Sequence, residues 1–170
     1  NYAQIRQKLC VDAYMQEATA FGAGIRILQQ DRWEALCSFL LSQCNNIQRI
    51  KKLVEALAQN FGKPIAFMGR TYYTFPEAAK IASLTMEDLA PLKCGYRAPY
   101  ILEAARAVAG GALDLEKLAQ KSCEEARQAL KQQKGIGDKV ANCILLFALR
   151  KADAFPVDVW MKKAIAQHYG

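Results

Sequence analysis

A lysine directly after a glycine turn is the residue of this sequence best suited to covalent chemistry. The sequence KGIGDK occupies positions 134–139 and precedes an apolar helical pattern, so Lys139 falls in the first turn of the expected helix. A cation there opposes the helix dipole. Partial burial would disfavour its ammonium form and free the amine for nucleophilic attack. The residues alone leave open a second interpretation, in which Lys139 binds a phosphate group.

The turn before this lysine consists of Gly135 and Gly137 on either side of Ile136. Two glycines permit a turn too tight for side chains, and they leave backbone N–H groups and a helix N-terminus open to an anion. A DNA phosphate would suit this site, and such a contact carries no sequence information. An ordinary helix connection with glycines at a C-cap explains the same residues equally well.

A carboxylate stands at the start of the last expected helix, where the sequence FPVDVW covers positions 155–160. Asp158 is an expected N-cap, and taken alone this structural role is the preferred interpretation. The helix dipole would also keep the carboxylate ionised. It could then stabilise positive charge developing on a sugar, or help to manage the proton of Lys139.

The overall composition favours a polyanionic partner. Twenty-three Lys and Arg residues face 16 Asp and Glu residues, which gives a net charge of +7, and 52% of the residues are apolar. No apolar run approaches the roughly 20 residues of a membrane-spanning helix, and the first residues lack a signal-peptide pattern. Nucleic acid is therefore the expected partner, and a membrane is not.

The cysteine and histidine residues argue against a cofactor. The six cysteines are scattered without a C-x-x-C pair, which speaks against a zinc site or an iron–sulfur cluster and fits reduced thiols in an intracellular protein. The single histidine, His168, lies near the end of an amphipathic pattern, where a solvated surface position is expected. We therefore expect no cofactor and no histidine-based acid–base chemistry.

Helical periodicity runs along the whole chain and predicts an all-α fold. A first helix is expected near positions 2–20, Asp31 caps a buried second helix, and Asn45 or Asn46 caps a third that ends at Gly62. The stretch 63–75 reads as a looser segment without a strand pattern.

The later helices carry clear start signals. Pro76 suits the first turn of a short helix, and capping boxes begin at Thr85 and Ser122. The sequence CGYR at 94–97 predicts a turn before a helix that ends at Gly110, and a helix, glycine hairpin and helix cover about 123–149. No linker marks a domain boundary. The missing initiator Met and the end at position 170 suggest a fragment of a longer protein.

Together these motifs resemble the helix-hairpin-helix superfamily of DNA glycosylases (HhH-GPD), whose signature joins a hairpin, a catalytic lysine after it and a later Pro-Val-Asp segment. The matching positions here are 135–139 and 156–158. The sequences NNIQRI at 45–50, GYRA at 95–98 and KVANC at 139–143 look like the 8-oxoguanine DNA glycosylase branch. The resemblance implies that residues 1–170 form a helical glycosylase core of two subdomains around a cleft. The family's N-terminal sheet domain and final helices would lie outside it.

The resemblance also implies roles for residues at the damaged base. Lys139 would form a Schiff base with the sugar, Asp158 would assist it, and Cys143 would flank the flipped base. Cation binding at the hairpin is possible in the family, and the candidate ligands are the backbone carbonyls of Lys131, Gln133 and Ile136.

Further roles concern the DNA around the vacated position. Tyr96 would wedge into the base stack, while Arg49 and Arg97 would hydrogen-bond the orphaned cytosine. Asn45, Gly135, Ile136 and Gly137 would contact DNA as well. The plainer alternatives are a half-buried turn aromatic for Tyr96 and simple phosphate contacts for the two arginines.

Three positions depart from the family pattern. Cys44 replaces an asparagine that fills the gap left by the flipped base, so contacts to the opposite base are in doubt. Lys134 replaces the usual hairpin proline, and Trp160 replaces a histidine that often contacts a phosphate. None of these changes removes a group that the chemistry needs.

The function implied by the resemblance is removal of 8-oxoguanine from duplex DNA in base excision repair, with β-elimination through a lysine Schiff base. Such a bifunctional glycosylase and abasic-site lyase would act as a monomer on chromosomal DNA, in the nucleus or the bacterial cytoplasm. Two alternatives stay open. One is a sibling glycosylase for oxidised pyrimidines, and the other is a non-catalytic helix-hairpin-helix module that only binds DNA.

Overall fold

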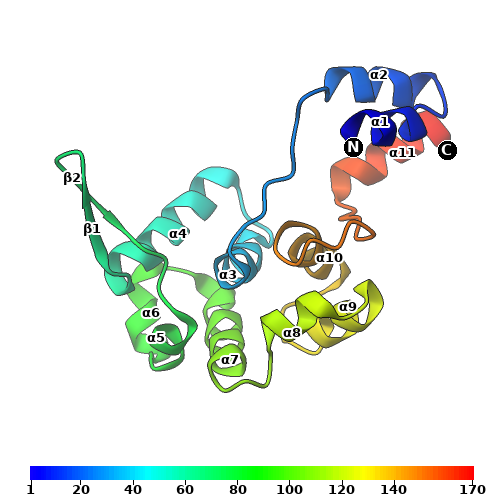
Figure 1. Cartoon of the computed structure of the whole chain (residues 1–170). Coiled ribbons are helices and arrows are strands. Elements are labelled where there is room, and N and C mark those ends of the chain that lie inside the picture. The colour runs from blue at the N-terminus through cyan, green and yellow to red at the C-terminus, as the bar shows by residue number, and fades with distance from the viewer. The chain divides into compact units, whose positions relative to one another are not determined.

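The computed structural model describes all residues from Asn1 to Gly170 and divides the chain into two compact units (Figure 1). The terminal unit comprises residues 1–28 and 157–170, and the central unit comprises residues 29–156. The fold is all-α apart from one small hairpin of strands. No helix combines the length and the apolar character that crossing a membrane would require. The predicted cleft between two subdomains stays a prediction.

The terminal unit contains three helices, which are α1 (Tyr2–Leu9), α2 (Ala13–Phe21) and α11 (Val159–Tyr169). The prediction of one helix over positions 2–20 is therefore wrong. Asp12 separates α1 from α2 because its carboxylate accepts the Met15 N–H at 2.8 Å and so acts as a new N-cap. No residue of these three helices is buried.

Aromatic contacts join α2 to α11 within the terminal unit. The rings of Tyr14 and His168 lie 4.4 Å apart, and the Tyr169 hydroxyl donates to the Asp12 carboxylate at 2.9 Å. His168 is exposed, which confirms the predicted surface histidine.

The central unit begins with α3 (Arg32–Ser42) and α4 (Ile47–Phe61). The predicted caps are confirmed, since Asp31 accepts the Glu34 N–H at 2.9 Å and Asn46 accepts the Arg49 N–H at 2.9 Å. Leu53 and Leu57 of α4 are buried in the core, whereas Ile47 at its start is 71% exposed.

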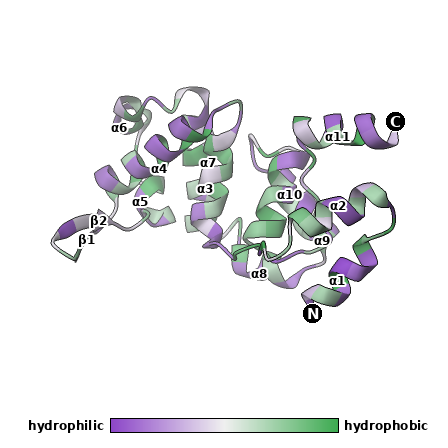
Figure 2. Ribbon diagram, turned by 90° about the horizontal axis from the view of Figure 1, so that it is seen from above, coloured by the Kyte–Doolittle hydropathy of each residue, from purple (hydrophilic) through white to green (hydrophobic).

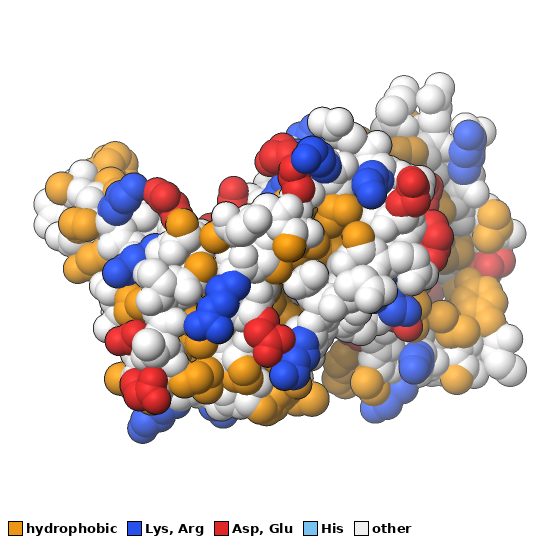
Figure 3. All heavy atoms as spheres, turned by 90° about the horizontal axis from the view of Figure 1, so that it is seen from below, with side chains coloured by type: hydrophobic (Ala, Val, Ile, Leu, Met, Phe, Trp, Pro, Cys, Tyr) orange, Lys and Arg blue, Asp and Glu red, His pale blue; other side chains and the backbone are white.

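A two-stranded antiparallel sheet follows α4, and its strands are β1 (Pro64–Phe67) and β2 (Arg70–Tyr73). The sequence predicted no strand here. The strands have only four residues each, all of them exposed, which is too short for an alternating pattern. Met68 and Gly69 close the turn with φ of 49° and 72°, so backbone conformation rather than burial defines this hairpin. It projects at the left in Figures 1 and 3 and carries hydrophobic side chains.

Short elements lead from the sheet to a long buried helix. They are α5 (Ala78–Ala82), α6 (Met86–Leu89), the 3₁₀ turns η1 (Ala90–Leu92) and η2 (Gly95–Arg97), and α7 (Ala98–Ala109). The capping box at Thr85 is confirmed. Pro76 lies one residue before Glu77, the N-cap of α5, and therefore outside the first turn where the sequence placed it.

The last helices of the central unit are α8 (Leu115–Gln120), α9 (Cys123–Lys131) and α10 (Asp138–Phe147). The predicted capping box at Ser122 opens α9. α10 packs beside α3 and α9, and both α7 and α10 carry long hydrophobic stretches (Figure 2). The fully buried core side chains include Leu36, Leu40, Leu41, Leu57, Ile81, Leu89, Ile101, Leu130, Ile144 and Leu145. Both α3, which ends at the 43–46 turn, and α10, which begins after the glycine turn, contribute to this core.

Candidate functional site

The glycine turn between α9 and α10 is anchored by one buried side chain. Ile136 is 5% exposed and packs into the core, and its N–H donates to the Gln133 carbonyl at 3.1 Å. Gly135 has a φ of +84°, in the left-handed region that favours glycine. The predicted tight hairpin is confirmed.

The start of α10 is open. Gly137 is its N-cap, and no side chain makes a capping hydrogen bond there. The N–H groups of a first helical turn have no partner within the helix, so they remain available to an anion. The geometry therefore suits the phosphate contact expected of Gly135, Ile136 and Gly137.

Lys139 is the second residue of α10 and its side chain is exposed. The partial burial that would favour its free amine is thus not present in the chain itself. Cys143 lies four positions later, on the same side of the helix, and is 4% exposed. The first turns of α10 thus present the lysine to solvent, whereas the cysteine is buried.

Two ion pairs hold the hairpin. The Lys131 ammonium lies 2.6 Å from the Asp138 carboxylate across the turn, and the Lys134 ammonium lies 3.2 Å from Glu103 on α7. The hydrogen bond from Lys131 lowers the pKa of the Asp138 carboxyl group below its ordinary value. Lys134, which replaces the proline that the resemblance implies, thus ties the turn to α7.

A second turn, at residues 43–46 between α3 and α4, receives side chains from η2. Arg97 is 4% exposed; its Nε donates to the Gln43 carbonyl at 2.8 Å and its terminal nitrogen donates to the Cys44 carbonyl at 2.9 Å, with a further bond to Gln43. The Tyr96 hydroxyl donates to the same Gln43 carbonyl at 3.1 Å. The buried guanidinium therefore holds the turn, and its contact with an orphaned base stays a prediction.

Tyr96 is half-exposed and held on two sides. The Arg97 guanidinium carbon lies 4.4 Å from the centre of its ring. A hydrogen bond with the Cys44 side chain raises the pKa of the Tyr96 phenol above its ordinary value. Cys44 itself is exposed and has a φ of 45°.

The residues after Cys44 shape the same turn. The Asn45 amide donates to the Leu41 carbonyl at 3.0 Å, while its oxygen accepts the Asn46 N–H at 3.0 Å. Arg49 is exposed and donates to the Lys93 carbonyl at 3.1 Å. Asn45, Arg49, Tyr96 and Arg97 thus lie on or beside the 43–46 turn, and their contacts with DNA stay a prediction.

Asp158 belongs to the terminal unit and caps α11. Its carboxylate accepts the Met161 N–H at 2.8 Å, which confirms the predicted N-cap. Trp160 is 75% exposed, and the Lys163 ammonium lies 5.0 Å from its ring centre. The joint action of Asp158 with Lys139, which lies in the central unit, stays a prediction.

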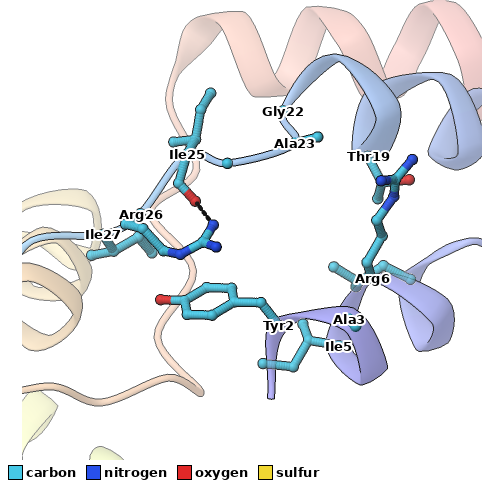
Figure 4. A pocket seen from close by; sticks show the side chains of 12 residues that line it. Tyr2, Ala3, Ile5, Arg6, Thr19, Gly22, Ala23, Ile25, Arg26 and Ile27 are labelled. Carbon is cyan, nitrogen blue, oxygen red and sulfur yellow. Dashed lines mark hydrogen bonds between the residues drawn. The ribbon is translucent and has the colours of Figure 1, made fainter.

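A separate hollow of about 400 Å³ lies within the terminal unit (Figure 4). Arg26 reaches over the Tyr2 ring at 3.9 Å and donates to the Ile25 carbonyl at 3.0 Å. None of the predicted site residues lines it. This hollow is therefore distinct from the two turns.

Sequence reasoning missed three residues that organise these turns. The Gln43 carbonyl accepts from both Tyr96 and Arg97, and Lys93 presents its carbonyl to Arg49 from a left-handed conformation with a φ of 56°. Tyr100 lies against Gly135. Only Tyr100 had a sequence signal, since it stands four positions after Tyr96 at helical spacing.

Comparison with known protein families shows to which superfamily the chain belongs. The sequence model described as "HhH-GPD superfamily base excision DNA repair protein" matches residues 37–170. The chain belongs to this superfamily. The HhH-GPD match contains both turns, Lys139 and Asp158, and so supports the resemblance found in the motifs.

Individual relatives of this HhH-GPD chain are also named as DNA glycosylases. It is 36% identical over 158 residues to the N-glycosylase/DNA lyase of Saccharomyces cerevisiae, covering 86% of this chain and 42% of that protein. It is 36% identical over 137 residues to the DNA-3-methyladenine glycosylase of Bacillus subtilis, covering 79% of this chain and 45% of that protein. The chain thus spans less than half the length of these relatives.

A solved structure extends the agreement to the fold. The 8-oxoguanine glycosylase/lyase of Clostridium acetobutylicum, in complex with double-stranded DNA containing cytosine opposite 8-oxoG, superposes with a TM-score of 0.95 at 37% identity. The match covers 100% of this chain and 59% of that one. The HhH-GPD fold is therefore present throughout the chain.

Proposed function

We propose that this HhH-GPD chain is the catalytic core of a bifunctional DNA glycosylase that removes 8-oxoguanine and then cleaves the abasic strand. The observation that carries the proposal is the exposed Lys139 in the first turn of α10, directly after an uncapped glycine turn. The similarity to the C. acetobutylicum 8-oxoguanine glycosylase/lyase supports the choice of lesion.

DNA binding comes first in the proposed mechanism. The phosphate backbone meets the open N–H groups at Gly137, and the basic side chains add attraction that is independent of sequence. Extrusion of the damaged guanine costs a few kcal/mol of stacking and pairing. Tyr96 replaces part of the lost stacking, and Arg49 hydrogen-bonds the orphaned cytosine. Arg97 reaches the same base only by exchanging its bonds to the 43–44 carbonyls.

The covalent step follows at the sugar. The Lys139 amine attacks C1′, the bond from C1′ to the base breaks, and the base leaves with the bonding electrons and takes up a proton. The sugar ring opens to a Schiff base, which acidifies C2′. Loss of the C2′ proton expels the 3′ phosphate and nicks the strand, and water then releases the lysine.

Two side chains would support this step, and a cation at the glycine turn would support DNA binding. Asp158, held as the N-cap of α11, stabilises positive charge on the sugar. Cys143 flanks the flipped base. A hard cation would find oxygen ligands in the carbonyls of Lys131, Gln133 and Ile136, and the Gln133 oxygen has a second lone pair besides the one that accepts from Ile136. Such a cation would add positive charge at the turn, where a DNA phosphate is proposed to bind.

Borohydride trapping tests the proposal. The complete protein is incubated with duplexes that contain 8-oxoguanine opposite cytosine, an oxidised pyrimidine, 3-methyladenine or no lesion. We expect a covalent adduct and base release with 8-oxoguanine. Preference for the oxidised pyrimidine would instead support a sibling glycosylase, and preference for 3-methyladenine would favour the activity named for the B. subtilis relative. Binding to DNA without adduct or base release on any duplex would leave only a non-catalytic module.

A further inference from the structure

The two proposed DNA-binding turns of the central unit are connected by a tyrosine that neither turn contains. Tyr100 lies in the first turn of α7 and is partly buried against the core. Its ring is in contact with both the glycine turn and Tyr96. It has no role in the proposed mechanism.

The contact with the glycine turn is close. A Cβ atom added to Gly135 would lie 2.4 Å from Cδ2 and 2.7 Å from Cγ of the Tyr100 ring. Side-chain carbons do not approach one another so closely, so only a residue without Cβ allows the ring to rest on the turn. Two features therefore favour glycine at position 135: its φ of +84° and the lack of space for a Cβ atom beside the Tyr100 ring.

The contact with Tyr96 is a ring pair. The two ring centres lie 6.0 Å apart with an interplanar angle of 73°, the edge-to-face geometry that aromatic pairs favour. Tyr96 therefore has Tyr100 and the Arg97 guanidinium against its ring and the Gln43 carbonyl at its hydroxyl. These contacts fix its direction.

We propose that Tyr100 is a positioning residue, which sets the place of the Tyr96 ring relative to the phosphate-binding turn at Gly135. This inference rests on the proposed function. A phosphate held at the turn and a ring that enters the base stack must stand at a set separation, and Tyr100 spans them with one rigid ring. It contacts neither the sugar nor the base.

The test compares two reactions of the complete protein under single-turnover conditions. Tyr100→Leu is expected to slow excision of 8-oxoguanine by about 3- to 10-fold, the factor that corresponds to one aromatic pair. Strand cleavage at a preformed abasic site should change little, because no base has to be extruded. Tyr100→Phe keeps the ring and should restore excision. Tyr72→Leu removes a ring from the pair with Phe67 in the β1–β2 hairpin and serves as the matched control.

A double substitution separates positioning from general stability. If Tyr100 acts through Tyr96, then Tyr100→Leu added to Tyr96→Ala should cause no further loss of excision. Three results would overturn this inference and leave the proposed function in place. They are additive losses of excision in the double variant, an equal fall of excision and strand cleavage in Tyr100→Leu, and unchanged excision in Tyr100→Leu. Absence of both reactions in the unchanged protein would overturn the proposed function and this inference with it.

Discussion

The two turns proposed to hold DNA are built in opposite ways. The turn at 133–137 uses backbone: a left-handed Gly135, an uncapped helix start at Gly137 and one buried anchor, Ile136. The turn at 43–46 uses side chains, because Arg97 and Tyr96 both donate to its carbonyls.

This difference predicts opposite sensitivities. A backbone turn is damaged by added atoms, since its glycines leave no room, or no allowed conformation, for a side chain. A side-chain turn is damaged by removed atoms, since its carbonyls then lose the donors that the side chains supply. The contrast also suits the proposed roles. Phosphate contacts need only N–H groups, whereas contacts to an unpaired base need side chains held in place.

The largest expected effect concerns chemistry and leaves both turns intact. Lys139→Gln should abolish the borohydride adduct and reduce excision by roughly 10⁴- to 10⁶-fold, as expected for loss of a nucleophile. Binding to an 8-oxoguanine duplex should persist, because both turns remain. Lys117→Gln, on the exposed side of α8, is the matched control and should leave the adduct unchanged. An adduct that survives Lys139→Gln would show that another amine is the nucleophile.

The next effect tests the backbone turn by adding one methyl group. Gly135→Ala should lower the free energy of unfolding by about 2 kcal/mol or more, because the residue has a positive φ and its Cβ would meet the Tyr100 ring. Gly137→Ala adds the same group at a φ of −92° with no atom within 4 Å, so it should change stability by less than about 0.5 kcal/mol. Urea unfolding measures both. Equal losses would contradict the distinction between the two glycines.

Local signals were the part of this structure that the sequence predicted well. Asp31, Thr85, Ser122 and Asp158 all cap the helices expected of them, because a cap bonds to an N–H only two or three residues away. The glycine hairpin was predicted because its signal, two glycines on either side of Ile136, is local as well. Asp12 was missed although it is an equally good cap, since helical periodicity continues on both sides of it.

Contacts between distant parts of the chain could not be predicted in this way. Arg97 bonds to carbonyls 53 and 54 positions away, and nothing in its neighbours indicates that its guanidinium is buried. The motifs placed Tyr96 and Arg97 at DNA by resemblance, yet their bonds to Gln43 became visible only in three dimensions. The β1–β2 hairpin escaped prediction because its strands bury nothing.

A smaller loss is expected when the side-chain turn is weakened. Arg97→Lys should reduce the free energy of unfolding by about 1–2 kcal/mol, because one ammonium group cannot serve both the Gln43 and the Cys44 carbonyl in the geometry of the guanidinium. Arg49→Lys, at an exposed position, should change stability by less than about 0.5 kcal/mol. If the two substitutions cost the same in urea unfolding, the 43–46 turn does not depend on its buried arginine.

The smallest expected effect is the pH dependence of the ion pair between Lys131 and Asp138, one of the two ion pairs at the backbone turn. The hydrogen bond from Lys131 lowers the pKa of Asp138 in the folded chain, so its stabilisation is present above the unfolded value of about 3.9 and is lost as pH falls through the folded value. Asp138→Asn should therefore lower the melting temperature slightly at pH 7 and less at pH 3. In a Lys131→Gln background, Asp138→Asn should have a smaller effect at pH 7, because the partner is already gone. A loss that persists in that background would assign the stabilisation to the helix dipole of α10 instead of the ion pair.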